Sequence, residues 1–201
     1  MADRQSGSVE LVLASNSPRR RQLLSEAGYR FRVVSPAVEE PDPSPGVDPE
    51  AYAVHLAWLK ARDVARRCGP SALVLAGDTV VAVGRTILGK PADRADAKRI
   101  LLALSGKEHE VYTAVCVWLV PEQIWLAGCD RSRLYMKPWT DERLEEYLDR
   151  GDWRGKAGAY GIQDEDPNVV LLEGSYTNVV GLPVELVERL LEAAERVRSK
   201  R

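Results

Sequence analysis

The sequence predicts a single α/β domain spanning residues 1–201. Its first apolar run, Val9 to Ala14, is typical of a short buried strand. It leads directly to Ser17-Pro18, a hydroxyl N-cap followed by the residue best suited to the first helical position. The length suits one packed domain, or two lobes that share a core, because domains usually hold about 100–200 residues.

Charge and cysteine content argue against several classes of protein. Lys and Arg number 28 against 30 Asp and Glu, and the net charge of −2 argues against a general surface for nucleic acids or anionic membranes. Cys68, Cys116 and Cys129 show no C-x-x-C spacing, so neither a disulfide framework nor a zinc site is expected. The N-terminus lacks the apolar core of a signal peptide, and the longest apolar run, Ala72 to Val83, is too short to span a bilayer. We therefore expect a cytoplasmic protein.

The turn between the first strand and helix is the first candidate site. The first turn of a helix leaves amide N–H groups unpaired, and the macrodipole adds partial positive charge there. The hydroxyls of Ser15 and Ser17 are expected to converge on this concave spot, which attracts anions. Arg19 and Arg20 add two basic side chains. A phosphate site is one hypothesis, and a capped helix with solvated arginines is the other.

Two carboxylates follow the second predicted strand. Gly28 is expected to end the first helix, and Phe31 to Val34 to form the strand. Glu39 and Glu40 then stand at the edge of the proline-rich loop PDPSPGVDP. Carboxylates at a strand end can hold a hydrated cation, and a solvated glutamate pair is the alternative.

A lysine interrupts the apolar stripe of the next predicted helix. Asp48-Pro49 opens this helix, which is expected to run to about Arg67. At 3.6 residues per turn, Lys60 falls in the middle of a stripe formed by Ala53, Leu56, Ala57 and Val64. The lysine stem could snorkel along the core, or the ammonium could reach an internal anion.

A carboxylate also lies within the apolar run from Ser71 to Val83. Strand-like residues stand on both sides of Gly77-Asp78-Thr79. Burying a lone charge costs several kcal/mol, so Asp78 must pair with a cation, bind a metal or shift its pKa. Each outcome suits a metal ligand or a general base. Gly77 would allow a kink or the close approach of a ligand.

A hairpin turn at Val83 to Thr86 is expected to return the chain to Gly89-Lys90-Pro91. Lys90 would then end a strand near the point where Asp78 begins one. Strand ends are where loops carry chemistry, although an exposed lysine before a proline is ordinarily only solvated.

The remaining segments alternate between strand and helix patterns. Strands are predicted at His109–Val120, Ile124–Ala127, Arg131–Met136, Val169–Leu172 and Tyr176–Val180, and helices at Asp93–Leu104, from Thr140 to about Arg150 and from Pro183 to a basic, frayed C-terminal end. Lys156 to Gln163 is a glycine-rich loop with one amide at its tip. It could let the backbone contact a ligand, or it could be a flexible connection.

Together these features suggest a site for a metal and a polyphosphate. The candidate cations are Arg19, Arg20, Lys60 and Lys90, and the candidate anions are Glu40 and Asp78. A hard divalent ion would bridge phosphate oxygens to carboxylates and keep waters, one of which could act as nucleophile. The patterns G-x-x-x-x-G-K-[ST], G-x-G-x-x-G, G-x-S-x-G and H-E-x-x-H are absent, which argues against kinases, dehydrogenases, esterases and zincins.

Several short motifs follow one another along nearly the whole chain: Ala14–Arg20, Val38–Glu40, Lys60-Ala61, Gly77–Val81, Gly89–Pro91, Leu104–Gly106 with His109 and Thr113, and Ala157–Gln163. In this order they closely resemble the motifs of the Maf family of nucleoside triphosphate pyrophosphatases. The last block, with Gly174–Pro183, resembles the dTTP/UTP branch rather than the 7-methyl-GTP branch.

The resemblance implies an ITPase-like fold, with a long mixed sheet and two lobes around a central cleft, and a homodimer. It implies hydrolysis of nucleoside triphosphates to the monophosphate and pyrophosphate. Asp78 resembles the proton acceptor of the family. Arg19, Thr79 and Gln163 match positions linked to the choice of base.

The chemistry expected of these residues agrees with such a reaction. Mg²⁺ or Mn²⁺ bound by Glu40 and Asp78 would neutralise the triphosphate, and a water oriented by Asp78 would attack the α-phosphorus. Arg20, Lys60 and Lys90 would stabilise the charge on the leaving pyrophosphate.

The nucleotide base is expected to meet the glycine-rich loop. The Gln163 amide both donates and accepts, so it could match the adjacent N–H and C=O of uracil or thymine. Two departures from the family pattern stand nearby, Asp164 to Asn168 in place of a glycine-rich turn and Gly155 in place of an aspartate. The alternative functions are a 7-methyl-GTP-type pyrophosphatase and a non-catalytic nucleotide-binding regulator of cell division or septum formation.

Overall fold

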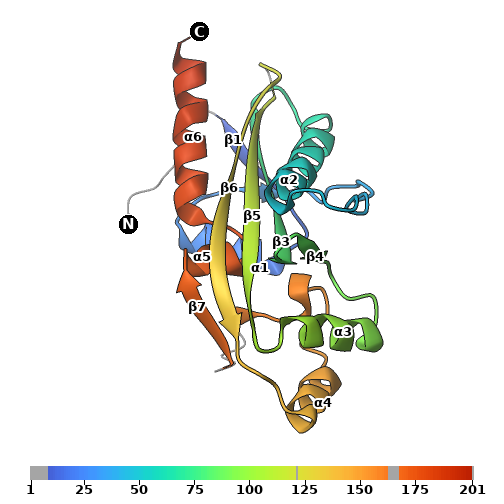
Figure 1. The fold of residues 1–201 in the computed structure, drawn as a ribbon. Helices are drawn as coiled ribbons and strands as arrows, with labels where there is room; N and C mark the ends of the chain where they lie inside the picture. The colour runs from blue at the N-terminus through green and yellow to red at the C-terminus, as the bar shows by residue number, and fades with distance from the viewer. Residues whose placement is uncertain (1–8, 121, 163–167, 201) are drawn as a thin grey trace.

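A seven-stranded mixed sheet forms the centre of the computed structural model, which describes residues 9–120, 122–162 and 168–200 (Figure 1). The strands are β1 (Glu10–Ala14), β2 (Arg32–Val33), β3 (Ala72–Val83), β4 (Thr86–Leu88), β5 (Lys107–Leu119), β6 (Ile124–Met136) and β7 (Val169–Glu173). Their order is β2-β1-β3-β5-β6-β7, with β4 paired to β3. β1 is parallel to β2 and β3, whereas β3, β5, β6 and β7 pair antiparallel, so the predicted long mixed sheet is confirmed.

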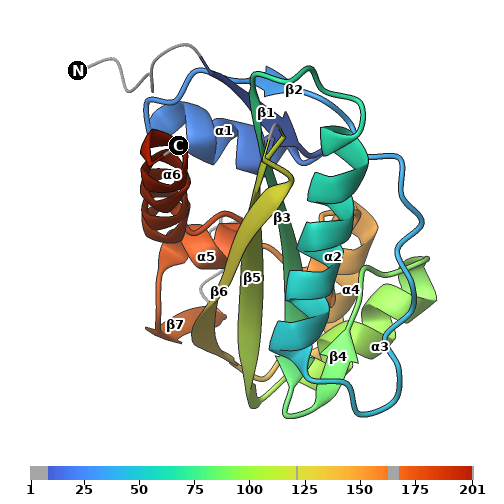
Figure 2. The same cartoon turned by 90° about the horizontal axis from the view of Figure 1, so that it is seen from above.

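Helices cover both faces of this sheet. α2 (Pro49–Ala65) packs on one face, and α1 (Pro18–Glu26), α5 (Tyr176–Val180) and α6 (Val184–Ser199) lie on the other (Figure 2). α3 (Arg94–Leu104) and α4 (Asp141–Arg150) gather at the lower end in Figure 1, where a further apolar cluster includes side chains from both. The basic C-terminal end, predicted to fray, is helical through Ser199.

Helix starts follow the capping residues found in the sequence. The side chains of Ser17, Asp48, Asp93 and Thr140 each accept a hydrogen bond from the backbone N–H three residues later. Each such cap typically stabilises a helix by about 1 kcal/mol. After α1, Gly28 has a φ of 84°, the left-handed conformation that glycine tolerates best.

Two predicted strand boundaries change in the structure. The segments on both sides of Gly77-Asp78-Thr79 form one continuous strand, β3, which pairs with β5 throughout that step. The predicted strands at Ile124–Ala127 and Arg131–Met136 are also one strand, because the intervening residues keep their register with β5.

The prediction of a strand at Tyr176–Val180 is wrong, because this segment is the helix α5. Its β-branched residues favoured a strand. However, the Ser175 hydroxyl caps the first turn by accepting from the N–H of Asn178, and Gly181 ends the helix with a φ of 121°. The Asn178 side chain is fully buried, and its amide nitrogen donates hydrogen bonds to Val111 on β5 and to Ser132 on β6. Local capping and these tertiary contacts override the strand propensity.

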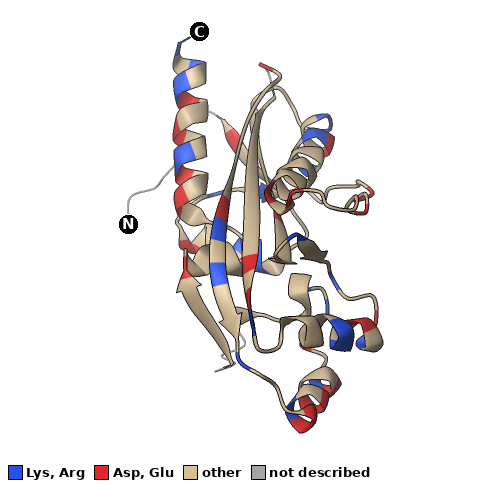
Figure 3. Ribbon diagram, viewed as in Figure 1, with Lys and Arg blue, Asp and Glu red and all other residues tan. Residues whose placement is uncertain are grey.

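Basic and acidic residues are interspersed along α6 and β6 in the ribbon of Figure 3. The three cysteines are free thiols. Among the described residues no helix is long and apolar enough to cross a membrane.

The described part of the glycine-rich loop contains a short 3₁₀ turn, Ala157–Ala159, and is anchored to the sheet. The N–H of Gly158 donates to the Gly89 carbonyl at 3.1 Å, and its α-carbon packs on Val81, where a Cβ would come within 3.0 Å of a methyl group. The loop then places Tyr160 against His109 of β5, with 2.6 Å between the phenol oxygen and Nε2. This buried contact fixes one wall of the cavity described below.

Replacing His109 with Gln is expected to reduce the amount by which the free energy of unfolding falls between pH 7 and pH 4.5. Burial lowers the pKa of His109 from 6.5 to about 4, so between these pH values the unfolded chain binds a proton that the folded chain does not. Stability must therefore fall as the pH falls through this window, by about 3 kcal/mol for the full titration. Urea denaturation at pH 7.0, 5.5 and 4.5 should show a smaller loss for H109Q than for the wild type. Equal losses would contradict this assignment.

Candidate active site

The residues predicted from separate motifs meet in one cavity of about 440 Å³. Those that line it are Ser15, Ser17, Arg19, Arg20, Glu40, Lys60, Asp78, Thr79 and Lys90. Gln163 and residues 164–167 lie outside the described residues. A larger hollow of about 650 Å³ between β1, β2 and α6 contains none of the predicted residues, so the smaller cavity is the candidate active site.

The Lys60 ammonium is held between two carboxylates. Its Nζ lies 2.5 Å from Oδ1 of Asp78 and 2.7 Å from Oε1 of Glu40. The side chains of Lys60 and Asp78 are 7% and 6% exposed, whereas that of Glu40 is 38% exposed. The lysine on the apolar stripe therefore reaches an internal anion and does not snorkel to solvent. Since each buried charge alone would cost several kcal/mol, neither is stable here without the other.

Small residues on α2 make this contact possible. Ala57, one helical turn before Lys60, and Ala61, the next residue after it, are fully buried and belong to the cluster that packs α2 against β1, β3 and β5. Residues without large side chains let the helix approach the sheet closely. The lysine stem is then long enough to bring its ammonium to the Asp78 carboxylate.

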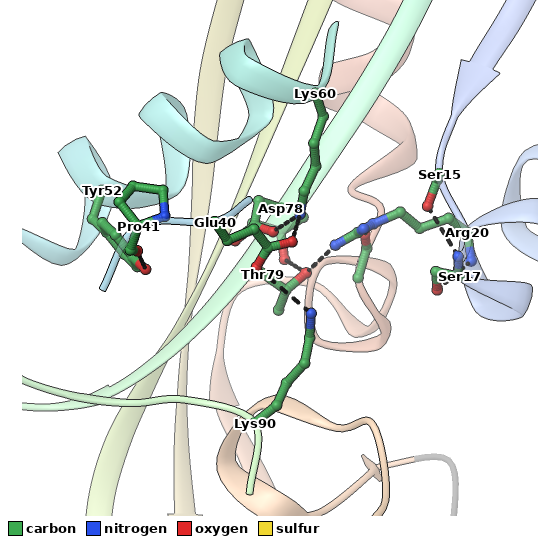
Figure 4. A network of polar contacts seen from close by, with 12 residues as sticks. Ser15, Ser17, Arg20, Glu40, Pro41, Tyr52, Lys60, Asp78, Thr79 and Lys90 are labelled. Carbon is green, nitrogen blue, oxygen red and sulfur yellow. Dashed lines mark hydrogen bonds and ion pairs between the residues drawn. The ribbon is translucent and has the colours of Figure 1, made fainter. Parts of the chain in front are cut away.

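Figure 4 shows Lys60, Lys90 and Arg20 approaching Asp78 and Thr79 from three sides. Lys90 follows β4, as the predicted hairpin requires, and its Nζ lies 3.9 Å from Oε2 of Glu40. Its side chain is 54% exposed, so this ion pair adds little to stability. The Lys90 ammonium therefore remains accessible to a ligand in the cavity.

Arg20 lies in a slot between two glycines. Its Nε donates to the Gly181 carbonyl at 2.8 Å, and its Nη2 donates to the Thr79 hydroxyl at 3.0 Å. A Cβ at Gly77 would come within 3.3 Å of Nε, and one at Gly181 within 3.3 Å of the Thr79 hydroxyl. The close approach expected at Gly77 is thus made by the Arg20 side chain. Burial lowers the pKa of Arg20, and the negative charge of Asp78 opposes that shift.

The turn before α1 has the predicted capped geometry. Ser15 Oγ accepts from the N–H of Ser17 at 3.1 Å, and Ser17 Oγ accepts from the N–H of Arg20 at 3.3 Å. In each contact the hydroxyl oxygen is the acceptor, so each serine keeps a proton that it can donate to an anion in the cavity.

Two basic residues of the wall were not singled out from the sequence. Arg154 and Lys156 line the cavity, and Arg19 of α1 donates to the carbonyl of Gly155 between them at 3.5 Å. The only signal in the sequence was their position, with Lys156 at the start of the glycine-rich loop and Arg154 just before it. Among the described lining residues, six side chains are basic and two are acidic, so the cavity suits a multiply charged anion.

The surroundings of Glu40 favour its charged form. Burial acts to raise the pKa of Glu40, but the hydrogen bond from Lys60 and the charges of Lys60, Lys90 and Arg20 outweigh it and lower that pKa. Glu40 is therefore ionised at neutral pH.

Residues 10–194 match the family of Maf-like proteins. The chain belongs to the Maf family. Among its Maf relatives, the dTTP/UTP pyrophosphatase of Rhodopirellula baltica is 46% identical over 193 residues, covering 94% of this chain and 84% of the relative. Those of Cereibacter sphaeroides and Dehalococcoides mccartyi are each 43% identical and cover 92% and 95% of this chain, and 95% and 85% of their own lengths.

A solved structure supports the fold that the Maf resemblance implied. The HAM1 protein from Coxiella burnetii aligns with a TM-score of 0.56, covering 94% of this chain and 99% of its own, at 16% sequence identity. This similarity concerns the fold alone, and it agrees with the predicted ITPase-like architecture.

Replacing Lys60 with Met is expected to destabilise the protein by about 3 kcal/mol at pH 7, because it leaves the buried Asp78 carboxylate without its cation. The matched change at the exposed Lys90, K90M, should cost less than about 0.5 kcal/mol. Urea denaturation measures both. In the double variant K60M/D78N the losses should be strongly non-additive, and additive losses would show that the pair is not coupled.

Proposed function

We propose that this Maf protein is a nucleoside triphosphate pyrophosphatase that hydrolyses dTTP and UTP to the monophosphate and pyrophosphate. The observation that carries this proposal is the cavity whose described lining holds six basic side chains, Lys60 among them, together with the Asp78 and Glu40 carboxylates that Lys60 contacts. A triphosphate tail is the anion whose charge and length suit such a cavity. The choice of dTTP and UTP as substrates rests on the names of the relatives.

The donor set fits a divalent ion such as Mg²⁺ or Mn²⁺. Glu40 and Asp78 direct oxygen atoms at one point, the position of the Lys60 ammonium. Among the described residues no group of three or more His, Cys, Asp or Glu forms a complete metal site. Mg²⁺ commonly binds through one or two carboxylates together with substrate phosphates and waters, so two ligands are sufficient here. When bound, the ion would neutralise phosphate charge and lower the pKa of a bound water.

We infer the roles of the chain's own residues from their positions in the cavity. Asp78 orients the attacking water and takes up its proton as the oxygen bonds to the α-phosphorus and the bond to the leaving pyrophosphate breaks. Arg20 and Lys90 stabilise the charge that develops on the leaving group, together with Lys60 once its ammonium contacts phosphate. Ser15 and Ser17 donate to phosphate oxygens at the turn before α1.

The base is proposed to lie toward the glycine-rich loop. Arg19 and Thr79 line the cavity, and Gln163 follows Ile162, the last described residue of the loop and itself part of the wall. An amide that both donates and accepts would favour uracil and thymine over cytosine. We further propose that the protein acts in the cytoplasm as a homodimer.

Replacing Asp78 with Asn is expected to lower the rate of pyrophosphate release from UTP and dTTP by a factor of about 10²–10⁴. The amide is not basic enough to take up the proton of the attacking water. Pyrophosphate should be measured with a panel of UTP, dTTP, CTP and 7-methyl-GTP in the presence of Mg²⁺ or Mn²⁺. Undiminished release by D78N would refute the catalytic role. A preference for 7-methyl-GTP in the wild type would overturn the choice of substrate, and inactivity on the whole panel would favour a binding regulator.

The Lys60 ammonium and a metal ion are expected to compete for the same two carboxylates. In the absence of nucleotide, K60M should therefore bind Mn²⁺ at least about tenfold more tightly than the wild type, since removal of a competing charge contact is worth more than about 1.4 kcal/mol. Electron paramagnetic resonance of free Mn²⁺ measures this binding without turnover. K90M is the control, with little expected change. Weaker Mn²⁺ binding by K60M would contradict metal ligation by this pair.

A further inference from the structure

We propose that Thr113 is a positioning residue for the active site: it fixes the hydroxyl of Thr79, which in turn holds the guanidinium of Arg20. Thr113 lies on β5, is fully buried and is not part of the cavity wall. This inference rests on the proposed function, since it assigns a role within the same site.

A chain of hydrogen bonds leads from the cavity to Thr113. Arg20 Nη2 lies 3.0 Å from the Thr79 hydroxyl oxygen, which lies 3.1 Å from the Thr113 hydroxyl oxygen. Thr113 in turn lies 2.8 Å from the backbone carbonyl of Asn178. Thr79 and Thr113 are directly opposite each other in the register of β3 and β5, so the sheet itself sets their spacing.

The direction of every hydrogen bond in this chain is determined. A carbonyl can only accept, so Thr113 must give its single hydroxyl proton to Asn178. Thr113 can then only accept from Thr79, which uses the one proton of Thr79. The Thr79 hydroxyl consequently presents only lone pairs to the cavity, and one of them accepts from Arg20. Without Thr113, the Thr79 proton would be free to turn toward the guanidinium and repel it.

Asn178, at the far end of this series of hydrogen bonds, is held in place by contacts with two strands. The Asn178 amide nitrogen donates to the Val111 carbonyl at 3.1 Å and to the Ser132 hydroxyl at 2.8 Å, which ties α5 to both β5 and β6. Its backbone N–H donates to the Ser175 hydroxyl at the start of α5. Gly181, whose carbonyl accepts from Arg20 Nε, ends the same helix. Both partners of Arg20 are therefore connected to α5: Gly181 ends this helix, and Thr79 is linked through Thr113 to the Asn178 carbonyl.

This arrangement leaves the Arg20 guanidinium oriented but not saturated. Of its five N–H groups, two bond to protein atoms in the described part of the chain, one to Gly181 and one to Thr79. The other three can donate to an anion. Because the side chain is already held in one conformation, phosphate binding does not have to order it, which is the benefit that positioning residues provide.

The test compares T113V and T113A, which lack the hydroxyl, with T113S, which retains it. With UTP or dTTP as substrate, T113V and T113A should lower kcat/KM by roughly tenfold to a hundredfold, and T113S should restore it to within about threefold of the wild type. V117A removes buried volume four residues further along β5, outside the cavity wall, and controls for loss of stability. It should leave kcat/KM unchanged after correction for the folded fraction.

A second measurement separates positioning from packing. Because Thr113 acts through Thr79, adding T113V to T79V should cause no further loss of kcat/KM. An equal loss for T113S and T113V, or a full additional loss in the double variant, would overturn the inference. If the wild type releases no pyrophosphate from any nucleotide of the panel, the proposed function fails. An active wild type with unimpaired T113V and T113A would refute only the role of Thr113.

Discussion

The ion pair between Lys60 and Asp78 is the constraint on which the rest of the site depends. Asp78 stands within β3 with its side chain 6% exposed, where an ionised carboxylate is stable only beside a cation. The partner comes from the inward face of α2, which must therefore lie close to this part of the sheet. Glu40 completes the cluster from the loop between β2 and α2. One electrostatic requirement thus fixes the relative positions of a strand, a helix and a loop that are distant in sequence.

The positive field of the cavity is local and does not extend over the molecule. The chain as a whole carries a net charge of −2, and many surface charges are paired, as in the contacts of Arg94 with Glu145 and of Arg133 with Glu108. In the cavity, by contrast, basic groups outnumber acidic ones among the described residues. Partial exclusion of water strengthens their attraction for an anion. A small, highly charged ligand is therefore favoured over an extended polyanion, which would need a basic surface.

Sequence patterns predicted the parts of the site that obey local rules. The N-cap at Ser17 and the place of Lys60 on an apolar stripe follow from helical geometry, so both could be recognised without coordinates. Tyr176–Val180 was assigned wrongly because its side chains favour a strand while its conformation is set by the cap at Ser175 and by contacts of Asn178. The role of Thr113 could not be recognised either. It depends on the register of β3 and β5, which places Thr113 opposite Thr79, 34 residues earlier in the sequence.

Some of the positions where the chain departs from local preference lie next to this cavity. Ala159 has a φ of 63°, and Asn178 Oδ1 is buried without a hydrogen-bond partner in the described part of the chain. Away from the cavity, Gln123 has a φ of 53° and Trp118 Nε1 is likewise buried without a partner among the described residues. Asp78 and Lys60 occupy positions where apolar residues would be neutral or stabilising by about 1–4 kcal/mol. Strain and buried polarity persist when a binding site requires them. The buried charges of Lys60 and Asp78 carry such a cost, and both side chains line the cavity, which is expected if that cavity is the functional site.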